Sequence, residues 1–106
     1  MAWIYILIAG VLEICWAIGL KYSDGFRRPT ASVVTVVLMI LSFLFLAKGL
    51  RTIPVGTGYA VWTGIGAAGT AILGIILFKE PLTIARLVCL ALVIGGIVGL
   101  KLVSPQ

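Results

Sequence analysis

The stretch AWIYILIAGVLEICWAIGL, residues 2–20, carries no charged side chain except that of Glu13. A helix rises about 1.5 Å per residue, so Glu13 lies roughly 3 Å from the middle of this run. The run is close to the length of about 20 residues that crosses the hydrocarbon core of a bilayer. A carboxylate at that depth is costly unless it is paired or protonated, which makes Glu13 a candidate functional residue.

The composition of the whole chain is that of a membrane protein. Of the 106 residues, 62% are hydrophobic and only 10% are charged, and the mean hydropathy is +1.28. The apolar residues come in long blocks, so we expect an all-α integral membrane protein that forms a single domain over residues 1–106. The four expected transmembrane helices cover residues 3–20, 29–47, 56–78 and 84–103.

The first segment is expected to remain in the membrane as a helix. Its first basic residue, Lys21, follows the apolar run, whereas a cleavable signal peptide carries positive charge before it. The net charge of +5 comes from residues scattered among loops and helix ends, which is the ordinary pattern beside membrane spans. We therefore expect a lipid bilayer, and no nucleic acid, as the partner of these charges.

Common catalytic centres are missing from the sequence. The chain has no histidine, which excludes histidine-dependent triads and metal sites, and it has no phosphate-binding loop. Cys15 and Cys89 both fall inside expected spans and give neither a disulfide framework nor a convincing metal site. We expect no enzymatic activity, no metal and no cofactor.

Glu13 has two interpretations. A buried carboxyl group can hold either a proton or a cation, but not both at once, and this exclusion is the minimum requirement for a proton-coupled antiporter. The alternative is a protonated, purely structural glutamic acid that bonds a neighbouring helix. Since ionisable residues inside membranes usually mark functional sites, the first interpretation is favoured.

Aromatic residues recur near the acid at helical spacing. Trp16 follows Glu13 by three residues, and Tyr59 and Trp62 repeat this spacing in the third span, so each pair shares a helix face. Aromatic faces attract cations, which makes these three residues candidates to line a cation site. The alternative is that these aromatic residues belong to the belt at the membrane interface or only pack in the core. For Ser42, in the second span, the pattern alone favours a bond to its own helix backbone.

Small residues recur every four positions in the third and fourth spans. Gly64 and Ala68 show this spacing, and Ala91, Gly95 and Gly99 extend it over two repeats. Such ridges let helix backbones approach closely in lipid, within one subunit or between subunits, and the longer run favours a dimer contact. Transporters place their site between inverted halves. One such half is present here, so we expect a second, inverted copy.

Two stretches resemble the signatures of small multidrug resistance transporters. AGVLEICWA, residues 9–17, resembles the first helix of that family, and PVGTGYAVWTGIG, residues 54–66, resembles its third, although Gly58 stands where alanine is common. FKEP, residues 78–81, is more similar to the guanidinium-exporter subtype than to the subtype that handles quaternary ammonium drugs. The resemblance covers essentially the whole chain.

This resemblance implies an antiparallel, dual-topology homodimer in the bacterial inner membrane that exchanges guanidinium for protons. It implies that Glu13 binds both the proton and the substrate. The residues that line or order the site would be Trp16, Ser42, Tyr59 and Trp62. A conformational bend would lie at Gly64 and Gly66, and the last helix would form much of the dimer contact.

Three other functions remain open. The first is a multidrug exporter of the same family, whose quaternary ammonium substrates depend on a broad aromatic cavity. The second is a membrane subunit that assembles with a partner and does not transport, which leaves Glu13 without a purpose. The third is a passive channel, which would conduct without requiring protons.

Basic residues are distributed almost evenly between the two faces of the membrane. The loops after the first and third spans share a face with five of them: Lys21, Arg27, Arg28, Lys79 and Arg86. The opposite face has three, or four with the terminal amine: Lys48, Arg51 and Lys101. The resulting positive-inside bias is weak.

We therefore predict that the chain inserts in both orientations, because neither face carries enough excess positive charge to fix one. Reporters fused to the C-terminus should give signals from both sides of the membrane. A signal from one side only would contradict this prediction.

Overall fold

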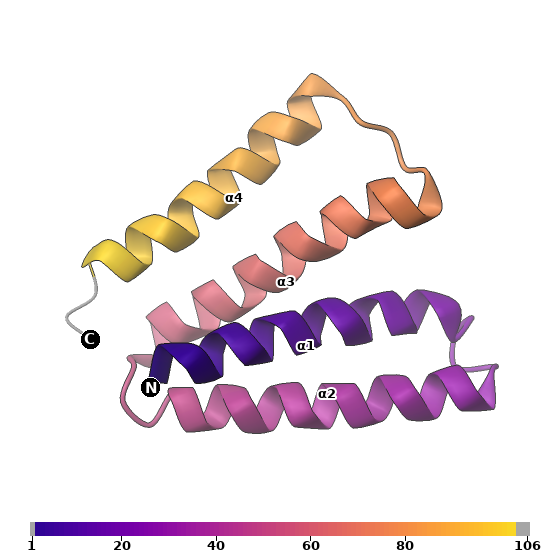
Figure 1. The fold of residues 1–106 in the computed structure, drawn as a ribbon, viewed down its shortest axis with the longest axis horizontal. Helices are drawn as coiled ribbons and strands as arrows, with labels where there is room; N and C mark the ends of the chain where they lie inside the picture. Colours follow the sequence, from indigo (N-terminus) through magenta and orange to yellow (C-terminus); the bar gives the residue numbers. More distant parts are fainter. Residues whose placement is uncertain (1, 104–106) are drawn as a thin grey trace.

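The computed structural model describes residues 2–103 of the chain. These residues form four long apolar helices joined by loops. They are α1 (Ala2–Tyr22), α2 (Pro29–Gly49), α3 (Val55–Phe78) and α4 (Ile84–Val103), and no strand is formed within these residues (Figure 1). All four are long and apolar enough to cross a membrane. The all-α, four-span architecture is therefore confirmed, and the chain is a multi-pass membrane protein. The amine of Met1 lies outside the described residues.

Local sequence signals set the helix limits, which fall within two residues of the expected spans. Pro29 is the first residue of α2, where its missing N–H costs nothing. α3 stops at Phe78 because Lys79 turns into the left-handed region, with φ 54°. The Lys79 N–H donates to the carbonyl of Gly74 and closes the helix end.

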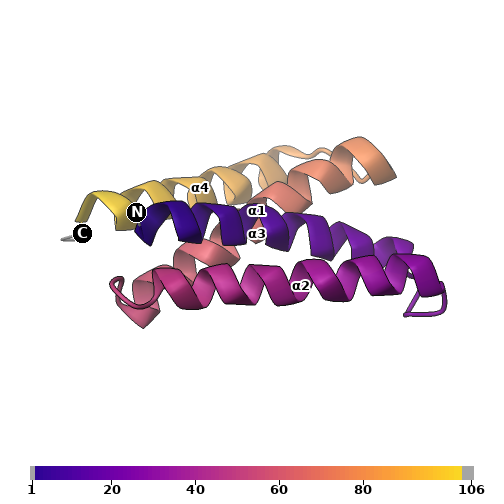
Figure 2. The ribbon, with the colours of Figure 1, turned by 60° about the horizontal axis from the view of Figure 1, so that its bottom comes forward.

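The first three helices form the body of the subunit. α1 packs against both α2 and α3, and it runs antiparallel to α2 and in the same direction as α3 (Figure 1). The backbone of α4 lies close to that of α3 alone, on the side away from α2 in both views (Figure 2). The buried core lies where α1, α2 and α3 meet and consists of Ile6, Ala9, Leu46, Ile53, Val61 and Trp62.

Glycines bring α1 and α3 together. A Cβ atom added at Gly10 would lie 2.7 Å from Cγ2 and 2.9 Å from Cβ of Ile65. A Cβ atom at Gly69 would overlap the side chain of Ile14 in the same way. In lipid, close van der Waals packing has to replace the hydrophobic effect between helices. These glycines therefore set the distance between the two helices that carry the candidate site.

The fourth helix leaves its small residues uncovered. α4 has no buried residue, and a Cβ atom added at Gly95 or Gly99 would meet nothing within 4 Å. Gly64 of α3 does contact α4, since a Cβ there would lie 2.9 Å from Ile97. Gly95 and Gly99 therefore make no close contact at the Cβ position inside one subunit, and Ala91 is exposed. The role of these three residues as a dimer contact stays a prediction.

Substitution of Gly10 by alanine tests the helix contact. The added methyl group cannot avoid Ile65, because it approaches Cβ, which moves only with the backbone. We expect Gly10→Ala to destabilise the purified protein by about 1–3 kcal/mol. The matched control is Gly56→Ala, since a Cβ at Gly56 meets nothing within 4 Å.

Unfolding in detergent, followed by circular dichroism, measures the effect. In an Ile65→Gly background the loss caused by Gly10→Ala should be smaller, because this background removes the Cβ atom that the added methyl group meets. Equal losses in both backgrounds would show that this contact does not set the helix distance.

Candidate functional site

Glu13 lies at the contact between α1 and α3. Within residues 2–103 it is the one acidic residue inside a helix, because Asp24 and Glu80 lie in loops. A Cβ atom added at Gly66 would overlap the carboxyl group of Glu13, so this carboxyl group lies directly against the α3 backbone. Its Oε1 atom is buried and has no hydrogen-bond partner among the described residues. Such a group is available to a proton or to a cation.

Ser42 ties the three core helices together. Its side chain is fully buried; Oγ donates to the carbonyl of Ala9 on α1 at 2.7 Å and accepts a hydrogen bond from Nε1 of Trp62 on α3 at 3.0 Å. The bond to its own helix backbone, which the sequence pattern alone favours, is therefore not the one that Ser42 makes. The hydroxyl group fixes the orientation of the indole of Trp62.

The Ser42 contacts lie next to the acid. Ala9 precedes Glu13 by four residues on α1, and Trp62 precedes Gly66 by four residues on α3. Four residues are about one helical turn. The hydrogen-bonded group of Ala9, Ser42 and Trp62, here called the Ser42 layer, therefore lies roughly 5–6 Å along the helices from the contact between Glu13 and Gly66. No hydrogen bond within residues 2–103 joins Glu13 to the Ser42 layer.

Four aromatic rings form a continuous row across the three helices. The ring centroids of Trp16 and Phe43 are 6.3 Å apart, those of Phe43 and Trp62 are 5.7 Å apart, and those of Tyr59 and Trp62 are 5.4 Å apart. The first two pairs meet edge to face, a favourable geometry for aromatic rings. The Nε1 atom of Trp16 is buried and has no partner among the described residues.

The structure thus brings the five predicted site residues into one region built by α1, α2 and α3: Glu13, Trp16, Ser42, Tyr59 and Trp62. Phe43 joins them and was not anticipated, since a single phenylalanine in an apolar helix has no distinguishing signal in the sequence. The roles of the five predicted residues in substrate contact stay predictions.

The glycine pair of the third span has two separate environments. Gly66 lies against Glu13, whereas Gly64 faces Ile97 of α4. α3 is helical through both glycines, so the proposed bend at Gly64 and Gly66 stays a prediction. The close approach of Gly66 to the carboxyl group was missed, although the small size of this residue in the expected site was the available signal.

The arrangement suits an organic cation. It combines one carboxyl group with aromatic faces, and cation–π contacts contribute about 0.5–2 kcal/mol each, depending on desolvation. Among residues 2–103 no group of three or more histidine, cysteine, aspartate or glutamate side chains is placed to hold a metal ion. The carboxyl group and the aromatic faces can bind and release a cation or a proton.

Comparison with known proteins gives a consistent picture. The profile of the family described as Small Multidrug Resistance protein matches residues 1–93. A protein named "Guanidinium exporter" from Yersinia pseudotuberculosis is 58% identical over 104 residues, which cover 98% of this chain and 100% of that protein. Proteins of the same name from Citrobacter freundii and Salmonella typhimurium are 58% and 54% identical over 102 residues, 96% of this chain and 97% of each relative.

Removal of the Ser42 hydroxyl group tests the link between the three helices. Ser42→Ala leaves the indole N–H of Trp62 buried without a partner, so we expect a loss of about 1–3 kcal/mol in stability. Ser32→Ala is the matched control on the same helix, because the exposed Ser32 hydroxyl bonds only the carbonyl of Arg28 four residues back.

Unfolding in detergent measures stability, and indole N–H resonances in NMR spectra report the geometry. Ser42→Ala should shift the Trp62 resonance more than those of the other tryptophans. Equal stability losses in the two serine variants, with the Trp62 resonance unmoved, would contradict the role assigned to Ser42.

Proposed function

This chain belongs to the small multidrug resistance family, and we propose that it is an antiporter that exports guanidinium cations in exchange for protons. The observation that carries this proposal is the carboxyl group of Glu13, whose Oε1 atom is buried against α3 and has no hydrogen-bond partner within residues 2–103. The relatives named "Guanidinium exporter" match this chain over nearly its full length and support the substrate class.

The substrate fits the chemistry of the site. Guanidinium is planar and permanently charged, and a carboxylate such as that of Glu13 can bind it through paired hydrogen bonds. Its weak hydration makes it easier to desolvate than an ammonium ion. Its flat face can lie against the rings of Trp16 or Trp62. Tyr59 and Ser42 complete the proposed lining, with Ser42 acting through the orientation of Trp62.

Coupling to protons follows from competition at one carboxyl group. When Glu13 binds guanidinium it is ionised, and when it takes up a proton it loses its attraction for the cation. A proton that arrives from one side of the membrane therefore discharges guanidinium to that side. An inward proton gradient would drive net export by repeated exchange.

Alternating access requires a second copy of the chain. One subunit offers a single set of four helices, and an inverted second subunit would supply the other half of the cavity. We propose an antiparallel homodimer in the bacterial inner membrane, in which two Glu13 side chains share one central site. The contact would use the uncovered stripe of α4, which consists of Ala91, Gly95 and Gly99. A bend of α3 at Gly64 and Gly66 would convert the dimer between a conformation open to one side of the membrane and a conformation open to the other side.

Replacement of the carboxyl group tests the proposal. Glu13→Gln keeps the size of the side chain but cannot alternate between a charged and a neutral state, so it should reduce guanidinium uptake driven by a proton gradient to background. Uptake is measured in liposomes that contain the purified protein. Asp24→Asn, which removes a carboxylate from the loop between α1 and α2, should transport like the wild type.

Full exchange by Glu13→Gln would contradict the proposed mechanism. A parallel measurement with tetra-alkyl ammonium separates the two kinds of exporter, since the proposal predicts that the wild type prefers guanidinium. Equal or better transport of the quaternary ion would favour the multidrug alternative.

A further inference from the structure

A groove lies at the end of the contact between α1 and α3. It has a volume of about 370 Å³, and its lining includes three charged side chains, those of Lys21, Glu80 and Arg86. Ala17 and Thr70 line its inner part. Ala17 follows Glu13 by four residues on α1, and Thr70 follows Gly66 by four on α3. The groove therefore begins about one helical turn beyond the contact of Glu13 with α3 and opens toward the membrane face.

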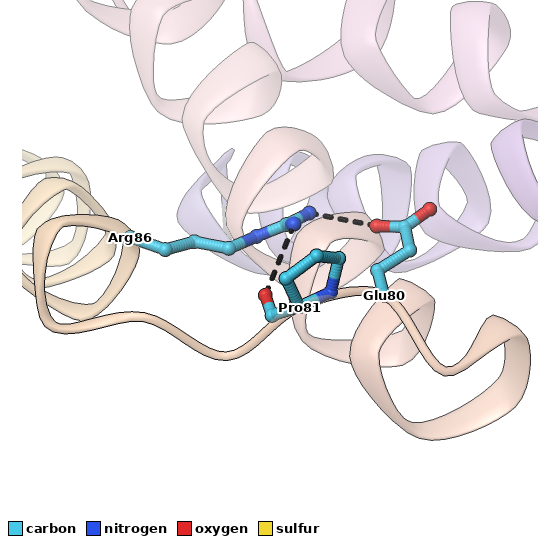
Figure 3. Close-up of polar contacts among 3 residues, drawn as sticks. All are labelled: Glu80, Pro81 and Arg86. Carbon is cyan, nitrogen blue, oxygen red and sulfur yellow. Dashed lines mark hydrogen bonds and ion pairs between the residues drawn. The ribbon is translucent and has the colours of Figure 1, made fainter.

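Glu80 is the one carboxylate in this lining, and it already binds a guanidinium group. Nη2 of Arg86 donates to Oε1 of Glu80 at 2.7 Å, and Nη1 donates to the carbonyl of Pro81 at 3.3 Å. Figure 3 shows the Arg86 side chain reaching back from the start of α4 to the loop that follows α3. Oε2 of Glu80 accepts no hydrogen bond within residues 2–103.

The ion pair is open to exchange. The side chains of Arg86 and Glu80 are 32% and 41% exposed, so water screens their attraction and a second cation can reach the carboxylate. On the inner side, the carboxyl group of Glu80 lies against Gly74 of α3. The backbone N–H of Glu80 also donates to the carbonyl of Gly74 at 3.4 Å, so the end of α3 positions this residue beside the groove.

From this geometry we propose that Glu80 is a peripheral docking site for guanidinium-type cations and that the Arg86 side chain competes with these cations for the Glu80 carboxylate. The inference rests on the proposed function, because it assigns the same class of substrate to a second carboxylate. A free guanidinium ion has the same donor chemistry as the Arg86 side chain and replaces it on Glu80. The substrate then lies in the groove that leads toward Glu13.

Electrostatics explains why such a carboxylate is needed. Lys21 and Arg86 both line the groove, and Lys21 lies with Nζ 5.9 Å from the centroid of the Phe78 ring, without an ion pair to Glu80. Without Glu80 the groove would present two positive charges to a cationic substrate and repel it. Glu80 offsets one of these two charges and supplies the carboxylate to which a cation can bind, in competition with Arg86.

The inner part of the groove offers one further acceptor. The Oγ1 atom of Thr70 is buried and has no hydrogen-bond partner among the described residues. It lies between the charged end of the groove and the helical turn that holds Gly66. A small rotation of the Thr70 side chain would turn this unpaired oxygen toward the groove, where a guanidinium ion that leaves Glu80 could donate to it.

The test compares initial rates of guanidinium transport in liposomes over a range of guanidinium concentrations. Glu80→Gln should raise KM by about threefold or more at low ionic strength, with kcat retained, and the effect should shrink in high salt. Arg86→Gln should lower KM, because it frees Glu80 from its competitor. Asp24→Asn is the matched control, since it removes a carboxylate at the same membrane face outside the groove, and its KM should not change.

The opposite signs of the two effects are the decisive result. If the ion pair only fixed the turn between α3 and α4, both variants would impair transport in the same direction, and that outcome would overturn the proposal. A lower KM for Arg86→Gln supports it even where Glu80→Gln folds poorly, because damage to the fold does not improve apparent affinity. If the wild type transports guanidinium normally and both variants have the KM of the wild type, the docking site is overturned and the proposed function is not. A wild type that does not move guanidinium would overturn the proposed function and this inference with it.

Discussion

A carboxyl group inside a hydrocarbon layer is the constraint on which the rest of this molecule depends. Glu13 lies within a helix long and apolar enough to cross the membrane, where an unpaired charge is costly, so it needs a proton, a cation or hydrogen-bond donors. The described residues give its Oε1 atom no donor. The carboxyl group lies against the backbone of Gly66, and Trp16, which belongs to the aromatic row, follows it by three residues on α1. The surroundings thus give this oxygen no fixed partner, as the proposed exchange of a proton for a cation requires.

The position of this carboxyl group is set by how closely α1 and α3 approach. Gly10 and Gly69 admit the side chains of Ile65 and Ile14, and Gly66 between them admits Glu13 itself. The same helix pair continues into the groove where Glu80 and Arg86 meet. Packing, proposed substrate binding and proposed docking thus share one helix interface. A change in the distance between these two helices would act on all three at once.

Much of the fold was readable from local sequence, whereas the contacts of the site were not. The apolar runs and Pro29 give the helices and their limits because these signals act within a few residues. The partner of Ser42 lies 33 positions away on α1, and the place of Phe43 between two tryptophans depends on how three helices are rotated against each other. A nearly uniform apolar sequence carries little information about that rotation. The resemblance to a family supplied Ser42 as a candidate where the residue pattern favoured a local bond.

The central proposal for this protein is that a proton and an organic cation exclude each other at Glu13. Proton release on ligand addition measures this directly, with purified protein in weakly buffered detergent solution and guanidinium added near neutral pH. The wild type should release protons into solution in proportion to the guanidinium bound, and Glu13→Gln should release none. Saturating guanidinium binding by the wild type without any proton release, over the whole pH range in which the protein transports, would contradict the account.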